Sequence, residues 1–143
     1  MAQDATGGTP VVEGLFAQTA DGPRLLGSRC SGCGTPYFPR ASVCNHPECP
    51  GGTLESAAFG PAGTLWSWAV QNYPPPPPAR YDEPYSPYTL GLVDLAEGLR
   101  VLARLRSADP ARLRAGMAVS LVLAPLCRDA SRGELLTWQF EPA

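Results

Sequence analysis

The sequence predicts a mostly β protein in two parts, and three observations lead to this fold class. Of the 143 residues, 17 are proline and 15 are glycine, which favours many turns and few long helices. From residue 53 onward, apolar residues recur with the two-residue period of strands. Before that point, residues 30–49 show little apolar periodicity but hold four of the five cysteines, so a bound metal is the better candidate for ordering them.

The N-terminal 1–23 segment is expected to be a tail with one short helix. Residues 1–10 are rich in Gly, Thr and Asp, and they lack the basic start and apolar run of a signal peptide. Over 11–19, Val12, Leu15 and Phe16 would share one helical face, which predicts the helix. A strand over 24–29 then leads into the first cysteine pair.

Two close cysteine pairs over 24–59 predict a zinc site. The first pair has two residues between its cysteines and the second has four; the ligands would be Cys30, Cys33, Cys44 and Cys49. Four thiolates about 2.3 Å from the ion complete a tetrahedron and leave no position for a substrate, so this zinc would be structural. His46 lies inside the second pair and is an alternative ligand. Ordinary thiols or one disulfide are the competing interpretation.

Five main strands follow over 60–143. We expect them at 64–73, 88–95, 99–105, 117–124 and 134–140, after a shorter strand at 53–59. In the first of these, Trp66 and Trp68 share a face and are expected in the core. Asp109 and Pro110 predict the start of a short helix between the third and fourth strands. This order suits a five-stranded OB-fold barrel, with a small β-sandwich as the competitor.

Composition and charge exclude several functions. The net charge is -2, which disfavours a protein held on nucleic acid by phosphate contacts. No run approaches the roughly 20 apolar residues of a membrane helix. With one histidine, no lysine and no recognisable nucleophile–base pair, the isolated chain is not expected to be an enzyme.

Paired cysteines indicate metal in a reducing compartment, so we expect a cytoplasmic protein. Cys127, the fifth cysteine, is expected to be a small buried side chain.

Several motifs occur in an order typical of one family. The run LLGSRCSGCGTPYFPRASVC contains C-x-x-C-G-x-x-x-F-P-R, whose positions are Cys30, Cys33, Gly34, Phe38, Pro39 and Arg40. GTLWSW at 63–68, GLVDLAEGLRVLARL at 91–105, and Leu113 with Gly116 and Met117 follow it. Together they resemble the zinc-ribbon/OB-fold proteins long filed as a domain of unknown function, whose ribbon is rubredoxin-like. The wider Cys44–Cys49 pair departs from the family pattern.

The resemblance implies a non-catalytic accessory subunit of lipid or steroid metabolism. Members of the family are similar to scaffolds for thiolase-fold enzymes, such as a thiolase, a synthase or a steroid side-chain aldolase, and help to bind or channel acyl-CoA. The expected partners are therefore a thiolase-fold subunit, in a hetero-oligomer, and acyl-CoA. A single-stranded nucleic-acid-binding OB module and an iron rubredoxin-like redox protein are the alternatives.

Two surface features are candidates for these contacts. Three arginines are expected on one strand face, either in solvent or bound to the phosphates of coenzyme A: Arg100, Arg104 and Arg106. The proline-rich loop from Tyr73 to Tyr88 is either a rigid surface loop or a protein interface. The aromatic residues proposed for that interface are Tyr37, Phe38, Tyr73, Tyr81 and Tyr85.

Overall fold

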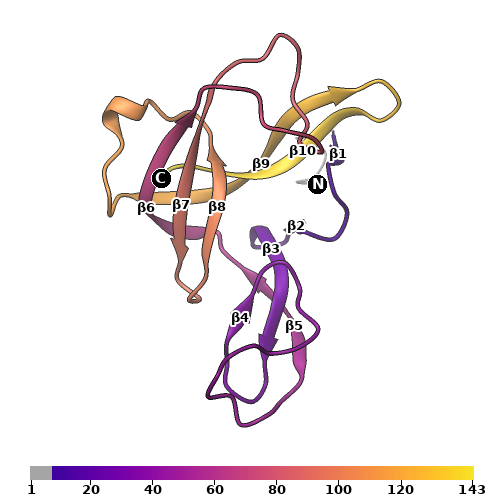
Figure 1. Cartoon of the computed structure of the whole chain (residues 1–143), viewed down its shortest axis with the longest axis vertical. Helices are drawn as coiled ribbons and strands as arrows, with labels where there is room; N and C mark the ends of the chain where they lie inside the picture. The colour runs from indigo at the N-terminus through magenta and orange to yellow at the C-terminus, as the bar shows by residue number, and fades with distance from the viewer. Residues whose placement is uncertain (1–7) are drawn as a thin grey trace.

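The computed structural model describes residues 8–143, whose strands form two sheets (Figure 1). The smaller sheet contains β2 (Phe16–Thr19), β3 (Gly22–Cys30), β4 (Pro36–Tyr37) and β5 (Leu54–Phe59). We call residues 16–59 the ribbon. The larger sheet contains β1 (Thr9–Pro10), β6 (Ala62–Gln71), β7 (Tyr88–Leu95), β8 (Arg100–Leu105), β9 (Ala118–Asp129) and β10 (Gly133–Pro142). We call β6 to β10 the barrel.

The barrel is closed by five strands in the order β6-β7-β8-β10-β9, with β9 pairing back onto β6. All neighbours are antiparallel except β8 and β10, which run parallel with Leu105 opposite Phe140. A 3-10 turn, Pro110–Arg112, joins β8 to β9, and the Asp109 carboxylate caps it by accepting a hydrogen bond from the Ala111 amide. This connectivity is that of an OB-fold, and it confirms the barrel over the sandwich.

The helix expected over 11–19 is wrong. Residues 16–19 form β2, which pairs antiparallel with β3, while the Val11 amide donates to the carbonyl oxygen of Leu136. Gly14 has a φ of 83°, which ends any helical path there, and the turn between Thr19 and Gly22 favours a hairpin. Among residues 8–143, no helix is both long and apolar enough to cross a membrane.

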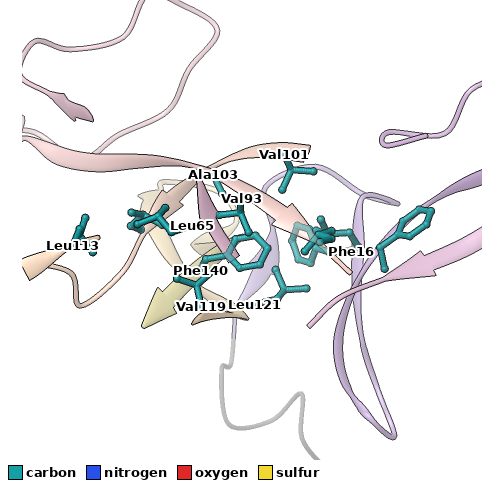
Figure 2. Packing of buried hydrophobic residues seen from close by; sticks show 13 residues of the cluster. Phe16, Leu65, Val93, Val101, Ala103, Leu113, Val119, Leu121 and Phe140 are labelled. Carbon is teal, nitrogen blue, oxygen red and sulfur yellow. The ribbon is translucent and has the colours of Figure 1, made fainter. Parts of the chain in front are cut away.

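One hydrophobic cluster extends from the barrel into the ribbon (Figure 2). Leu65, Val93 and Phe140 fill its barrel side, where the alternating residues of β7 and β8 point inward. Leu25 of β3 and Phe59 of β5 belong to the same cluster and are fully buried. The end of the ribbon nearest the barrel is therefore packed as part of the barrel core.

Strand β6 differs from expectation at Trp66, which is 51% exposed. The pairing of β6 with β7 shifts between Leu65 and Ser67, so Trp66 is the extra residue of a β-bulge. Leu65 takes the core position, and Trp68 packs against the cluster beyond the bulge. The expectation of a core Trp66 is wrong, because a bulge resets which residues face inward.

Candidate metal centre and ligand surfaces

The four paired cysteines converge in the ribbon. Strand β3, which ends at Cys30, leads away from the barrel (Figure 1). All four sulfurs lie within 4.8 Å of one another. The Cys33–Cys44 sulfurs are 3.5 Å apart and the Cys30–Cys49 sulfurs 3.7 Å apart. Sulfurs about 2.3 Å from a tetrahedral ion would be about 3.8 Å apart, whereas a disulfide bond needs about 2.05 Å. The geometry therefore fits one four-thiolate ion and no disulfide.

Glycines allow the two cysteine turns to meet. Gly34 has a φ of 77°, and its amide donates to the Cys30 carbonyl oxygen at 2.8 Å to close the first turn. A Cβ on Gly32 would lie only 2.1 Å from the carbonyl oxygen of Gly51, in the segment that follows the second pair. Any side chain at Gly32 would push these backbones apart and open the cluster.

The electrostatics of the cluster favour a bound cation. Hydrogen bonding to Thr35 lowers the pKa of Cys33 to about 6. A hydrogen bond from the Gly51 amide lowers the pKa of Cys49, but burial and the neighbouring thiols outweigh it and raise that pKa to about 12. One thiolate thus suppresses the ionisation of its neighbour. A divalent ion would remove this conflict, and an all-sulfur donor set suits zinc.

Tyr37 and His46 lie beside the cluster. The Tyr37 hydroxyl donates to Cys44 Sγ at 3.2 Å and accepts a hydrogen bond from the Asn45 amide at 2.7 Å, so it orients the Cys44 thiol. His46 is exposed, and its Nδ1 accepts from the Glu48 amide at 3.2 Å. The group of converging ligand atoms contains the four cysteines and not His46.

Phe38 lies at the junction between ribbon and barrel. Its ring meets that of Trp138 edge-on, with centroids 5.3 Å apart at an angle of 89°. At Gly60, between β5 of the ribbon and β6 of the barrel, the amide donates to Glu97 Oε2 at 3.2 Å. The other carboxylate oxygen, Oε1, is buried without a hydrogen-bond partner. Phe38 therefore makes an internal contact that fixes the ribbon on the barrel.

The structure separates the three candidate arginines. Arg100 is committed to Asp94 by two hydrogen bonds of 2.6 and 3.0 Å, and its guanidinium carbon lies 4.0 Å from the Trp66 ring centroid. Arg104 and Arg106 instead line a hollow of about 820 Å³ beside the end of β8, which we call the arginine pocket. Its other polar lining residues include Thr89, Ser107, Asp109 and Gln139.

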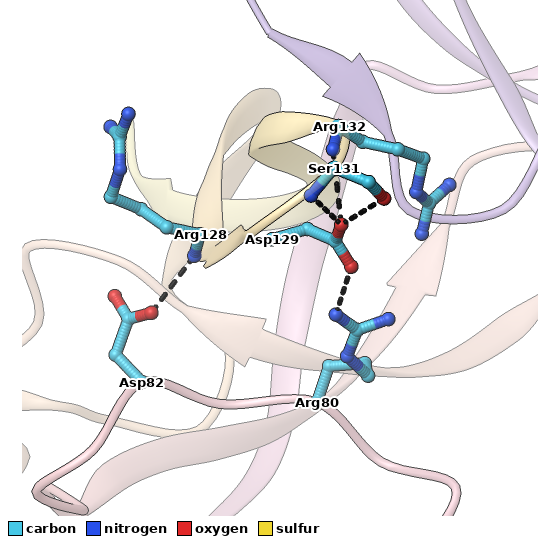
Figure 3. Close-up of polar contacts among 6 residues, drawn as sticks. All are labelled: Arg80, Asp82, Arg128, Asp129, Ser131 and Arg132. Carbon is cyan, nitrogen blue, oxygen red and sulfur yellow. Dashed lines mark hydrogen bonds and ion pairs between the residues drawn. The ribbon is translucent and has the colours of Figure 1, made fainter.

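The proline-rich loop is clamped at two points to the β9–β10 hairpin (Figure 3). Arg80 forms an ion pair with Asp129, and the Arg128 amide donates to Asp82 Oδ1 at 2.8 Å. Asp129 also accepts from Ser131 and from the Arg132 amide. The Arg80 guanidinium, followed by these turn donors, holds the pKa of Asp129 well below its usual range.

The tyrosines of this loop have different environments. The Tyr85 hydroxyl donates to the Gln71 carbonyl oxygen at 2.6 Å, and the Tyr81 and Tyr85 rings meet edge-on with centroids 5.4 Å apart. Tyr73 is 68% exposed. Of the loop tyrosines proposed for an interface, Tyr81 and Tyr85 therefore hold the loop together, whereas Tyr73 faces solvent.

Two contacts, Arg80 with Asp129 and Asp82 with the Arg128 amide, form what we call the loop clamp, and neither was predicted from the sequence. The D-A-S-R sequence of the β9–β10 turn was a usable signal, because an aspartate often accepts hydrogen bonds from its own turn. The pairing of Asp129 with Arg80, 49 positions earlier, has no local signal.

Cys127 is buried, as expected, and burial raises the pKa of its thiol.

The chain matches two family models in succession. Residues 20–55 match the ChsH2 rubredoxin-like zinc ribbon domain, and residues 57–124 match the ChsH2 C-terminal OB-fold domain. A DUF35 domain-containing scaffold protein of Methanothermobacter thermautotrophicus is 32% identical over 122 residues, covering 82% of this chain and 86% of the relative.

Two further relatives are named as parts of enzymes. The benzoylsuccinyl-CoA thiolase subunit BbsA of Thauera aromatica is 31% identical over 128 residues, covering 88% of this chain and 83% of the relative. A solved structure described as an Ltp2-ChsH2(DUF35) aldolase has a TM-score of 0.62 and 28% identity, covering 83% of this chain and 84% of that chain. The chain belongs to the DUF35 family, whose ChsH2-type members join a rubredoxin-like zinc ribbon to an OB-fold.

Proposed function

We propose that this chain is a non-catalytic scaffold subunit that assembles with a thiolase-like enzyme acting on acyl-CoA. The observation that carries the proposal is its likeness, over most of both chains, to a protein named as a thiolase subunit and to others named as scaffolds. A cysteine cluster without an open ligand position agrees with a structural role.

The proposed metal is one structural zinc ion held by the four clustered thiolates, Cys30, Cys33, Cys44 and Cys49. The zinc would supply no chemical step and would order the part of the ribbon that has no core. Unpaired thiols of this kind favour a reducing compartment such as the cytoplasm.

The proposed coenzyme A contact is the arginine pocket. Arg104 and Arg106 can offer guanidinium groups to phosphate oxygens, which favour forked, charge-assisted hydrogen bonds. Arg100 is a weaker candidate, because a phosphate would have to displace the Asp94 carboxylate from it. The alternative of nucleic-acid binding gains no support from the exposed Trp66, whose ring is covered by Arg100.

The proposed partner interface centres on the exposed side of the proline-rich loop. Tyr73 would contact the partner directly, since it is the most exposed of the candidate aromatic residues. Tyr81 and Tyr85 would support it by fixing the loop. Tyr37 and Phe38 would act from the ribbon, where one orients a cysteine and the other packs on Trp138.

Co-expression with a thiolase-fold protein encoded nearby tests this function. We expect a stable hetero-oligomer by affinity purification and light scattering, and acyl-CoA turnover by the complex. Arg106→Gln should raise the KM for acyl-CoA severalfold with assembly intact, while Arg100→Gln, whose guanidinium is already paired, serves as the matched control. A chain that ignores every such protein, or a turnover by the isolated chain that one point mutation abolishes, would contradict the proposal.

A further inference from the structure

Three sulfurs of the cysteine cluster contact hydrogen-bond donors of their own chain. The contacts are the Thr35 hydroxyl with Cys33 Sγ at 3.1 Å, the Tyr37 hydroxyl with Cys44 Sγ at 3.2 Å, and the Gly51 amide with Cys49 Sγ at 3.4 Å. A metal-bound thiolate carries no proton, so in each pair the oxygen or nitrogen is the donor. These donors stabilise negative charge on the sulfurs that would hold the ion.

The contact from Tyr37 differs from the other two in its span. Thr35 and Gly51 each lie two positions from the cysteine that they contact, so these hydrogen bonds shape a single turn. Tyr37 lies seven positions before Cys44, in β4, and β4 pairs with β3, the strand that ends at Cys30. One side chain therefore joins the strand that carries the first cysteine pair to the turn that carries the second.

The turn that carries Cys44 is not anchored by apolar burial. Val43 and residues 45–48 are exposed, and none of them belongs to the hydrophobic cluster. Tyr37 is half-buried and makes two hydrogen bonds to this turn, because its oxygen also accepts from the Asn45 amide at 2.7 Å. The phenol thus holds a sulfur and the next backbone amide in one geometry, which reduces the conformational freedom that metal binding must remove.

We propose that Tyr37 is a positioning residue of the metal centre, whose hydroxyl holds the Cys44 thiolate where the ion requires it and slows loss of the ion. The inference rests on the proposed zinc site and adds to it a residue that binds no metal itself. It gives the hydroxyl a role inside the chain, so the phenol oxygen is engaged before any partner subunit arrives. Loss of an outer contact of this kind typically weakens metal affinity by about 10–100-fold.

The test is Tyr37→Phe in the full chain, which keeps the ring and removes the hydroxyl. Zinc affinity is measured by competition with a chromophoric chelator, and zinc release by adding that chelator in excess. We expect the affinity to fall by about 10–100-fold and the release to become faster. The matched control is Tyr73→Phe, which removes a hydroxyl from an exposed side chain of the proline-rich loop and should leave both values unchanged.

Cobalt substitution separates the hydrogen bond from the packing of the ring. In the Co²⁺-loaded chain, the thiolate-to-metal charge-transfer absorption depends on the electron density at sulfur, so Tyr37→Phe should move it to longer wavelength. Thr35→Val removes the hydroxyl beside Cys33 and should also move this absorption. It should weaken zinc binding less than Tyr37→Phe does, because the Thr35 contact lies within a single turn.

An unchanged zinc affinity in Tyr37→Phe would overturn the inference, as would an unchanged cobalt spectrum. Equal losses of affinity in Tyr37→Phe and Thr35→Val would also overturn it, since joining the two turns would then contribute nothing. If Tyr37→Phe keeps its metal properties but weakens co-purification with a thiolase-fold subunit, the residue belongs to the partner interface instead. Absence of zinc from the wild-type chain would overturn the zinc site and this inference together, whereas failed co-purification would contradict the scaffold function alone.

Discussion

The ribbon and the barrel are ordered by different forces. The barrel buries apolar side chains such as Leu65, Val93 and Phe140 inside a closed sheet. Between residues 31 and 53 of the ribbon, no residue is buried, yet the cysteine turns meet at defined distances. A segment without a core must gain its order from elsewhere, and four thiolates around one ion can provide it. Hydrophobic periodicity therefore marks the barrel in the sequence, whereas cysteine spacing marks the ribbon.

The largest effect is expected from removal of one thiolate, which should disorder the ribbon and leave the barrel folded. Cys44→Ser should lose the zinc and the order of residues 31–53, because metal binding of about 10–16 kcal/mol in such modules is coupled to folding. Hydrogen exchange should show protection lost there and retained in β9 and β10. Elemental analysis should find about one zinc per wild-type chain.

Cys127→Ala is the matched control for the thiol count, since this cysteine lies in β9 away from the cluster. It should keep one zinc and a protected ribbon. Unchanged zinc content and protection in Cys44→Ser would show that the cluster does not order the ribbon.

A smaller effect is expected at the junction between the two parts. Phe59 is fully buried and belongs to the shared core, although it lies at the end of β5 in the ribbon. Phe59→Ala should lower the free energy of unfolding by about 3–5 kcal/mol through the lost burial and the cavity left behind. Denaturant titration should show ribbon and barrel losing stability together.

Phe38→Ala sharpens the comparison at the same junction. It removes one edge-on aromatic contact with Trp138, for which about 0.5–1.5 kcal/mol beyond the lost apolar burial is expected. If Phe59→Ala loosened only the ribbon by hydrogen exchange, the two parts would have separate cores, and the continuity of the cluster would have no energetic meaning.

The smallest effect should come from the loop clamp. Asp129→Asn should raise the exchange rate of amides in residues 72–87 with little change in global stability, because the ion pair lies at the surface. The pKa of Asp129 is lowered by Arg80, so the Arg80–Asp129 ion pair is complete above the ordinary Asp pKa of about 3.9 and is lost as pH falls through the lower folded value.

Hydrogen exchange read from pH 7 down to the acid range checks both statements. The wild-type loop should keep the protection that the Arg80–Asp129 ion pair provides below the pH at which ordinary aspartates protonate, while Asp129→Asn should lack that protection at every pH. Asp21→Asn, at an exposed turn of the ribbon, is the control and should behave like the wild type. Matching exchange profiles for Asp129→Asn and the wild type would show that the Arg80–Asp129 ion pair does not order the loop.

Much of the fold could be predicted from local patterns. Strand β7 was expected at 88–95 and is observed there, because its alternation is uninterrupted and turn residues bound it on each side. The cysteine cluster was accessible from spacing alone. Segment 11–19 was not, since its apolar spacing fits a helix as well as a hairpin, and only pairing with β3 and the conformation of Gly14 decide the outcome.

Long-range contacts explain the remaining differences. The bulge at Trp66 depends on register with β7, which no local pattern contains. Sequence alternation predicts one strand face for the three arginines, but Asp94 singles out Arg100 only once β7 and β8 are paired, and Arg106 lies beyond the end of β8. A hollow of about 700 Å³ is lined both by the prolines at 75–78 and by Leu90, Leu102 and Leu126 of three different strands, so it exists only when the barrel is closed.

The pairing of β1 with β10 has a mechanical consequence. The chain leaves the larger sheet after β1, forms the ribbon and returns to that sheet at β6, so the ribbon is connected to the larger sheet at both of its ends. Two covalent connections restrict rotation of the ribbon more than a single connection would. A displacement of the ribbon would be transmitted to β10 by two routes, the pairing of β1 with β10 and the contact of Phe38 with Trp138. Trp138 also lines the hollow beside the proline-rich loop. Movement of the ribbon is therefore coupled, through Trp138, to the shape of that hollow.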